Sequence, residues 1–159
     1  MDDEKREFLR HTLATLAYRG SKPLHDAPAS FATFRASEGS RSPVEILAHI
    51  GNLLEWALSL MRDQQTWHDS GPLSWDQEVL RFYATLKQVD DYLASGKKLG
   101  VPAEKLFQGP IADALTHVGQ ICMLRRLAGE AMRGENYFKA DIVTGRVGSE
   151  QQAARHEFD

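Results

Sequence analysis

The sequence has very little of what marks several common protein classes. Cys122 is the single cysteine among 159 residues, so no intramolecular disulfide can form, and this suits a reducing compartment. The charged N-terminal stretch lacks the apolar centre of a signal peptide, and no uninterrupted apolar run approaches the roughly 20 residues that cross a bilayer. These absences predict a cytoplasmic protein without a membrane segment.

Motifs of several enzyme classes and of nucleic-acid binding are also missing. The chain has no glycine-rich phosphate loop, no Gly-x-Ser-x-Gly elbow and no Cys-x-x-Cys pair. Its formal net charge is −3, and no basic stripe is interleaved with aromatic residues. Because nucleic-acid binding depends on a basic surface that neutralises phosphates, we expect no nucleic-acid partner.

The residues that are present describe one all-α domain over residues 1–159. Hydrophobic residues make up 42% and charged residues 26% of the chain, which is ordinary for a globular protein. Apolar residues recur at helical spacing in four stretches, which predicts an antiparallel four-helix bundle over residues 1–133. Residues 134–159 are predicted to form an irregular C-terminal extension that docks on the bundle or is partly mobile.

The predicted helix boundaries follow from capping residues. The first helix is expected over about residues 4–19 with Gly20 ending it, and the fourth is expected to open at Gly109-Pro110 and run to about Met132. Ser42 and Ser74 each begin a capping box, completed by Glu45 and Gln77, at the starts of the second and third helices. The Ser21–Arg41 region shows no period and is expected to be an irregular segment.

Two histidines on different predicted helices are candidates for metal ligation. His49 lies on the apolar face of the second helix, and His117 follows Asp113 by four residues on the fourth. Residues four apart share one helix face about 6 Å apart at their Cβ atoms, so both side chains can reach one ion. Metal sites in helical bundles are built from such inward side chains on facing helices.

Simpler interpretations of the same residues remain open. A histidine such as His49 on an apolar face is most often a packing residue. An acidic residue such as Asp113 in the first turn of a helix stabilises the helix dipole by about 0.3–1 kcal/mol without any metal, and it can also orient a histidine ligand. Glu45 lies one turn before His49, but the capping box already explains it.

The other histidines and the tryptophans give weaker evidence for a functional site. His11 is expected to pack, His25 is an outside candidate for substrate contact, and His68 and His156 are expected to be exposed. Trp67 and Trp75 flank the loop between the second and third helices and are expected to cover the bundle end. Trp56 either walls a pocket or packs in the core.

Two short motifs resemble the DinB-like family. Glu45-Ile46-Leu47-Ala48-His49-Ile50 resembles its second-helix signature, and Thr116-His117-Val118-Gly119-Gln120-Ile121 resembles its His-x-Gly-Gln-Leu motif. The resemblance implies a bacterial homodimer with up-down-down-up helices, and His49 and His117 as ligands of one divalent metal ion. Family members commonly carry a third histidine where this chain has Asp113, which is kept here as the third ligand.

The functional expectation is a metal-dependent enzyme acting on a small-molecule substrate. A two-histidine, one-carboxylate set suits zinc or nickel best, with iron(II) or manganese also compatible. The resemblance implies that a low-molecular-weight thiol is activated for transfer or isomerisation. The alternatives are a hydrolase with Glu45 or His25 as general base, a non-catalytic stress-response or dimerisation module with a vestigial site, and an iron(II) oxygenase.

Overall fold

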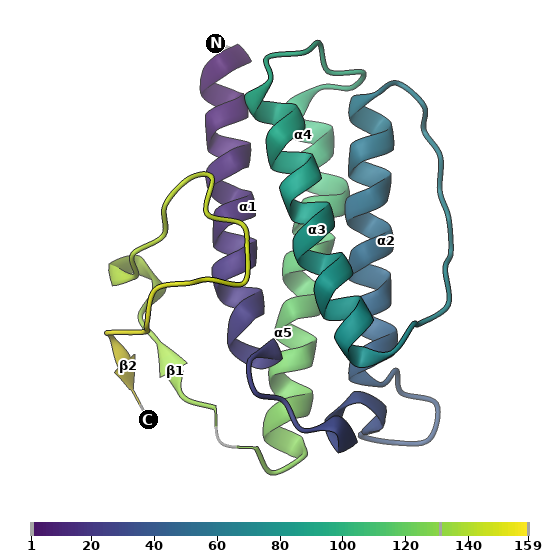
Figure 1. Ribbon diagram of the computed structural model, residues 1–159, viewed down its shortest axis with the longest axis vertical. Helices are drawn as coiled ribbons and strands as arrows, with labels where there is room; N and C mark the ends of the chain where they lie inside the picture. Colours follow the sequence, from purple (N-terminus) through teal and green to yellow (C-terminus); the bar gives the residue numbers. More distant parts are fainter. Residues whose placement is uncertain (1, 131, 159) are drawn as a thin grey trace.

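The computed structural model describes residues 2–130 and 132–158, and it confirms the predicted all-α bundle. Four long helices pack around one core, and a short two-stranded sheet lies beside them (Figure 1). The elements are α1 Asp2–Leu24, η1 Ala29–Thr33, α2 Pro43–Met61, α3 Trp75–Ala94, α4 Ala103–Leu106, η2 Phe107–Ile111, α5 Ala112–Leu127, β1 Gly134–Glu135, η3 Tyr137–Lys139 and β2 Glu157–Phe158.

Contacts between helix ends show the direction of each helix. Arg6, near the start of α1, donates a hydrogen bond to the carbonyl of Leu93 at the end of α3, so these two helices run in opposite directions. The Gly100 amide, just after α3, donates to the carbonyl of Met61 at the end of α2, so α2 and α3 run the same way. The long 62–74 connection makes this parallel pairing possible by returning along the bundle (Figure 1).

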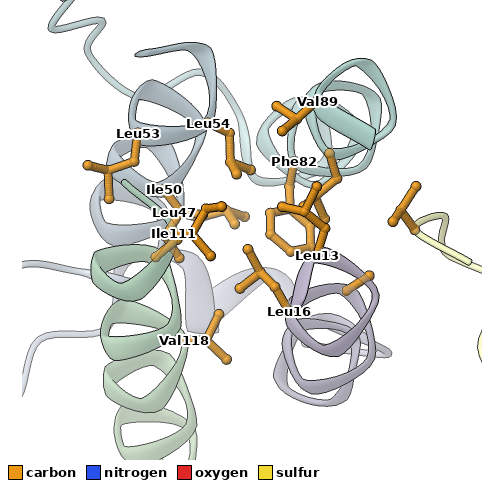
Figure 2. Close-up of a cluster of buried hydrophobic side chains, with 14 of the residues drawn as sticks. Leu13, Leu16, Leu47, Ile50, Leu53, Leu54, Phe82, Val89, Ile111 and Val118 are labelled. Atoms are coloured by element: carbon orange, nitrogen blue, oxygen red, sulfur yellow. The ribbon is translucent and has the colours of Figure 1, made fainter. Parts of the chain in front are cut away.

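The core contains leucine, isoleucine and phenylalanine side chains from all four long helices. Figure 2 shows Leu13 and Leu16 of α1 facing Leu47 and Ile50 of α2, with Phe82 of α3 between them. Helix α2 contributes the most to this core. It is long and apolar enough to cross a membrane, but 67% of its apolar window is buried inside the bundle, as in the core helix of a soluble protein.

The two capping boxes are confirmed. The Ser42 backbone amide donates to the Glu45 carboxylate at 2.7 Å, and the Ser74 hydroxyl accepts from the Gln77 backbone amide at 3.4 Å. Each box satisfies backbone amides that have no partner inside the helix. This fixes where α2 begins and therefore fixes the position of His49 along the bundle.

The prediction that Gly20 ends the first helix is wrong, because α1 continues to Leu24. Gly20 lies inside the helix, where an added Cβ would come within 2.8 Å of the Phe82 ring. This glycine therefore permits the close approach of α1 and α3 and has no role as a helix stop. The irregular Ser21–Arg41 region also contains η1, whose Phe31 is buried.

The predicted bounds of the fourth helix are wrong at both ends. Helical structure begins at Ala103, passes through the π-helical segment η2 and ends at Leu127, before the predicted end at Met132. Gly109 has a non-helical backbone (φ −92°, ψ −106°), and Pro110 follows it. The sequence pair that suggested a helix start is instead a kink within a longer helical segment.

The C-terminal extension contacts α1 and contains a strand pair that the sequence did not predict. β1 and β2 are antiparallel, with Gly134 opposite Phe158. The Tyr18 hydroxyl donates to buried Glu135, and Arg19 stacks on the Tyr137 ring at 4.0 Å. Phe138 of the same extension does not dock on the bundle, because its side chain is 96% exposed.

Candidate metal centre

Packing of α2 against α5 brings together the three residues predicted as ligands. His49 lies near the middle of α2, and Asp113 and His117 lie one turn apart near the start of α5. One donor atom from each residue can be chosen so that all three lie within 4.8 Å of one another. The His49 and His117 rings are edge to face, with centroids 4.8 Å apart. The group lies close enough to hold a metal ion.

The separations between donor atoms fit a shared ion. His117 Nε2 lies 3.4 Å from Asp113 Oδ1, and His49 Nε2 lies 3.7 Å from Asp113 Oδ2. Two donors that each lie about 2.1 Å from one ion at a tetrahedral angle are about 3.4 Å apart. Each imidazole therefore lies near ligand spacing from the Asp113 carboxylate, and the two imidazoles face different oxygens of it.

Gln120 orients the His117 ring. The Gln120 side-chain oxygen lies 2.7 Å from His117 Nδ1, one helical turn along α5. Because an amide oxygen only accepts hydrogen bonds, Nδ1 donates in this contact, and Nε2 is the ring nitrogen that faces Asp113. When this ring is neutral, the Nε2 lone pair and the Asp113 carboxylate face each other, an arrangement that a cation would stabilise.

The site is partly buried on its histidine side and open on its carboxylate side. The side chains of His49, His117 and Asp113 are 21%, 13% and 47% exposed. Burial lowers the pKa of His49 from its usual value, repulsion from His117 and Arg41 lowers it further, and the Asp113 carboxylate opposes part of this shift. This favours the neutral imidazole, which is the form that binds metal ions.

The helix-dipole interpretation of Asp113 is weakened by the new start of the helical segment. The amide of Ala112, directly before Asp113, already donates to the carbonyls of Phe107 and Gly109. Asp113 therefore does not sit at a free helix N-terminus, where a carboxylate would meet unpaired amides. Its nearest charged or ionisable partners are the two histidines.

Two tryptophans form an aromatic wall next to the site. The Trp67 ring meets the His49 ring and the Trp56 ring edge to face, each at a centroid distance of 5.9 Å. Trp67 belongs to the 62–74 connection, so the prediction that it covers the bundle end is wrong. This connection runs back along α2 (Figure 1) and so places Trp67 against His49 and Trp56 on the side of that helix.

The site lies between two cavities. A cavity of about 370 Å³ adjoins Asp113 and is lined also by Leu53, Trp56, Gln108, Gly109, Ala112 and Thr116. A smaller cavity of about 190 Å³ adjoins His49 beneath the 62–74 connection. The larger one borders the π-helical segment, a type of irregularity that is frequent at functional sites. Small molecules can therefore reach the candidate centre from two sides.

A buried polar network holds the 62–74 connection against α2. Arg81 of α3 donates to the Asn52 side-chain oxygen at 2.6 Å and to the Ala48 carbonyl at 3.3 Å. The Asn52 amide in turn donates to the Ser70 carbonyl, and the buried Glu78 carboxylate accepts from the Leu73 amide. This network fixes the backbone next to His49 and the outer wall of the smaller cavity.

The other candidate residues lie away from the centre or are already engaged. Glu45 accepts from Arg35 and from Ser42, and these hydrogen bonds lower its pKa to about 2, so it is a poor general base. His25 is exposed at the end of α1 and pairs with Asp26. His11 contacts Thr144, and burial raises the pKa of the Cys122 thiol, which keeps that thiol protonated.

Comparison of the chain with protein-family models, with curated proteins and with solved structures finds no match. The functional argument therefore depends on the chemistry of the three residues and their surroundings.

Proposed function

We propose that this chain is a metal-dependent enzyme that holds one divalent cation with His49, Asp113 and His117. The observation that carries the proposal is the convergence of two imidazoles and a carboxylate between two cavities. When bound, a divalent cation would lower the pKa of a coordinated thiol or water and so supply a nucleophile at neutral pH. Zinc and nickel suit these donors best, and iron(II) and manganese are compatible with them.

Exposure of the site favours a reactive centre over a structural one. Structural metal sites are closed, with four protein donors, whereas catalytic sites typically have three and leave a position for substrate. Among the described residues, the cluster found here contains three donor side chains, and Asp113 is half-exposed. A vestigial site in a non-catalytic module would not need access from two cavities.

Activation of a small thiol fits the surroundings better than hydrolysis does. A hydrolase needs a general base next to the attacking water. Glu45 is held ionised by its capping interactions, and His25 lines a different cavity together with the C-terminal extension. A thiol bound to a cation loses its proton directly, so the chain needs to supply only the ligands and the binding walls.

The resemblance to the DinB-like family supports the same proposal. The two quoted motifs carry His49 and His117, and Gln120 of the second motif orients His117. The proposal includes the family's further expectations: a bacterial, cytoplasmic homodimer that acts on a small molecule and binds neither nucleic acid nor membrane. Asp113 in place of the usual histidine lowers the net charge of the loaded site by one unit.

Metal-dependent stability tests the proposal. Protein freed of metal with a chelator should unfold at a higher temperature after addition of zinc or nickel, because an ion that binds only the folded state stabilises it. At a free metal concentration of 100 times Kd the gain is about 2.7 kcal/mol. For a domain of this size, this corresponds to about 5–11 °C, measurable by circular dichroism.

Turnover separates the enzymatic proposal from its alternatives. Metal-loaded protein should consume a small electrophile only when a thiol is added. Turnover without thiol would instead indicate the hydrolase, and tight metal binding without turnover under either condition would indicate the non-catalytic module.

A further inference from the structure

The smaller cavity next to His49 has a size and charge pattern that indicate a ligand. It has a volume of about 190 Å³, which corresponds to about six water molecules at roughly 30 Å³ each. It is lined by Arg41, Glu45, Ala48, His49, Asn52, Asp69, Ser70, Gly71 and Pro72. A space of this size can hold a molecule of a few heavy atoms.

The cavity wall carries one positive and one negative side chain that are not engaged elsewhere. Both residues are exposed, and within residues 2–130 and 132–158 neither the Arg41 nor the Asp69 side chain forms a hydrogen bond or an ion pair. Glu45 also lines the cavity, but its carboxylate accepts from Ser42 at 2.7 Å and from Arg35 at 2.9 Å. The charge of Glu45 is therefore already compensated, and Arg41 and Asp69 remain available to a ligand.

The walls between these two charges are held in place. Asn52 is buried, receives a hydrogen bond from Arg81 and donates to the Ser70 carbonyl. Arg41 directly precedes the Ser42 cap of α2, and Asp69 directly precedes the tethered Ser70. Both charged residues are therefore attached to fixed backbone on either side of His49.

We propose that this cavity binds a small zwitterion, an amino acid with a metal-binding side chain, with its carboxylate on Arg41 and its ammonium group on Asp69. This inference rests on the proposed function, because the side chain of the ligand would reach the ion held beside His49. It names the chemical class of the thiol: an aminothiol acid of the size of cysteine. A thiol that lacks the carboxylate would lose the contact with Arg41, and a thiol that lacks the ammonium group would lose the contact with Asp69.

Three related thiols test the inference on cobalt-loaded protein. Cysteine carries both charged groups, cysteamine lacks the carboxylate, and 3-mercaptopropionate lacks the ammonium group. Calorimetric titration should give cysteine a Kd about tenfold lower than either analogue, a difference of about 1.4 kcal/mol. Trp67, which contacts the His49 ring, provides an independent fluorescence signal for the same titrations.

Two substitutions should produce a crossed pattern. R41Q should weaken cysteine and 3-mercaptopropionate about tenfold and leave cysteamine unchanged. D69N should weaken cysteine and cysteamine about tenfold and leave 3-mercaptopropionate unchanged. R62Q and D63N are matched controls, because each changes the net charge by the same amount as R41Q or D69N. Both residues are exposed, follow the end of α2 and do not line the cavity.

The outcomes separate this inference from the proposed function. If cobalt binds with wild-type affinity in both variants but the affinities for the three thiols do not change, or change equally, the zwitterion site is wrong and the metal centre stands. If cobalt, zinc and nickel all fail to bind the wild-type protein, the proposed function fails first. The crossed pattern with unchanged controls supports both.

Discussion

Replacement of His117 by alanine should abolish most of the stabilisation by metal. Loss of a partner that merely orients a ligand typically costs 10–100-fold in metal affinity, so loss of the ligand itself should cost more than about 100-fold. At a metal concentration that stabilises the wild-type protein by about 2.7 kcal/mol, the variant should gain at most about 0.4 kcal/mol. Thermal unfolding with and without zinc measures this difference.

Two further variants show whether the effect belongs to the site. H11A removes an exposed histidine of α1 that contacts Thr144, and it should keep the full metal shift. Q120A keeps the ligand but releases the ring, because it removes the 2.7 Å hydrogen bond to Nδ1, and it should weaken binding by about 10–100-fold. An H117A protein that retains the wild-type shift would mean that the metal binds elsewhere.

Replacement of Arg125 by methionine should be strongly destabilising, although this residue lies outside the apolar core. Arg125 is buried, and one of its terminal nitrogens donates to the carbonyls of Lys22, Pro23 and His25 at 3.2, 2.9 and 2.7 Å. These carbonyls lie at the end of α1, where helices leave acceptors unpaired and where positive charge is favourable. Hydrogen bonds to a charged group contribute about 1.5–3 kcal/mol each, and unpaired buried acceptors add a penalty.

The expected loss for R125M is about 3 kcal/mol in the free energy of unfolding, measured by urea denaturation. R126M is the matched control, since Arg126 is exposed and makes one hydrogen bond of 3.3 Å to the Met132 carbonyl. It should change stability by no more than about 0.5 kcal/mol. Equal effects of the two substitutions would show that Arg125 does not cap α1.

Local sequence patterns were sufficient to predict a residue's contacts where those contacts lie within its own helix. Ser42 and Ser74 satisfy amides within four residues, so their capping boxes can be recognised without knowledge of the fold. Arg125 lies in the last turn of α5, where a basic residue suits the local helix dipole, but its side chain donates to the Pro23 carbonyl at the end of α1. That partner is 102 residues away in sequence, and no local pattern encodes it.

Gly20 was wrongly predicted to end a helix, and Gly109 was wrongly predicted to begin one. Gly20 allows α1 to approach Phe82, and Gly109 with Pro110 produces a kink inside a helical segment. A helix stop, a close contact and a kink all use the absence of a Cβ atom, so the residue type alone does not distinguish them. Neighbouring helices decide which of the three occurs.

The candidate ligands could be predicted, but most of their surroundings could not. The spacing of Asp113 and His117 places both on one helix face, and His49 stands out as a polar residue on an apolar face. Gln120 had the correct i+3 spacing to orient His117, and that signal was available. The up-down-down-up order implied by the resemblance requires a returning connection, but it does not say that Trp67 of that connection meets His49.

X-ray absorption at the metal edge of zinc-loaded protein tests the central claim most directly. The account predicts a first shell of nitrogen and oxygen donors at about 2.0–2.1 Å, with the scattering pattern of two imidazoles, one of which disappears in H49A. A sulfur donor at about 2.3 Å in the absence of added thiol, or a spectrum unchanged by H49A, would contradict it.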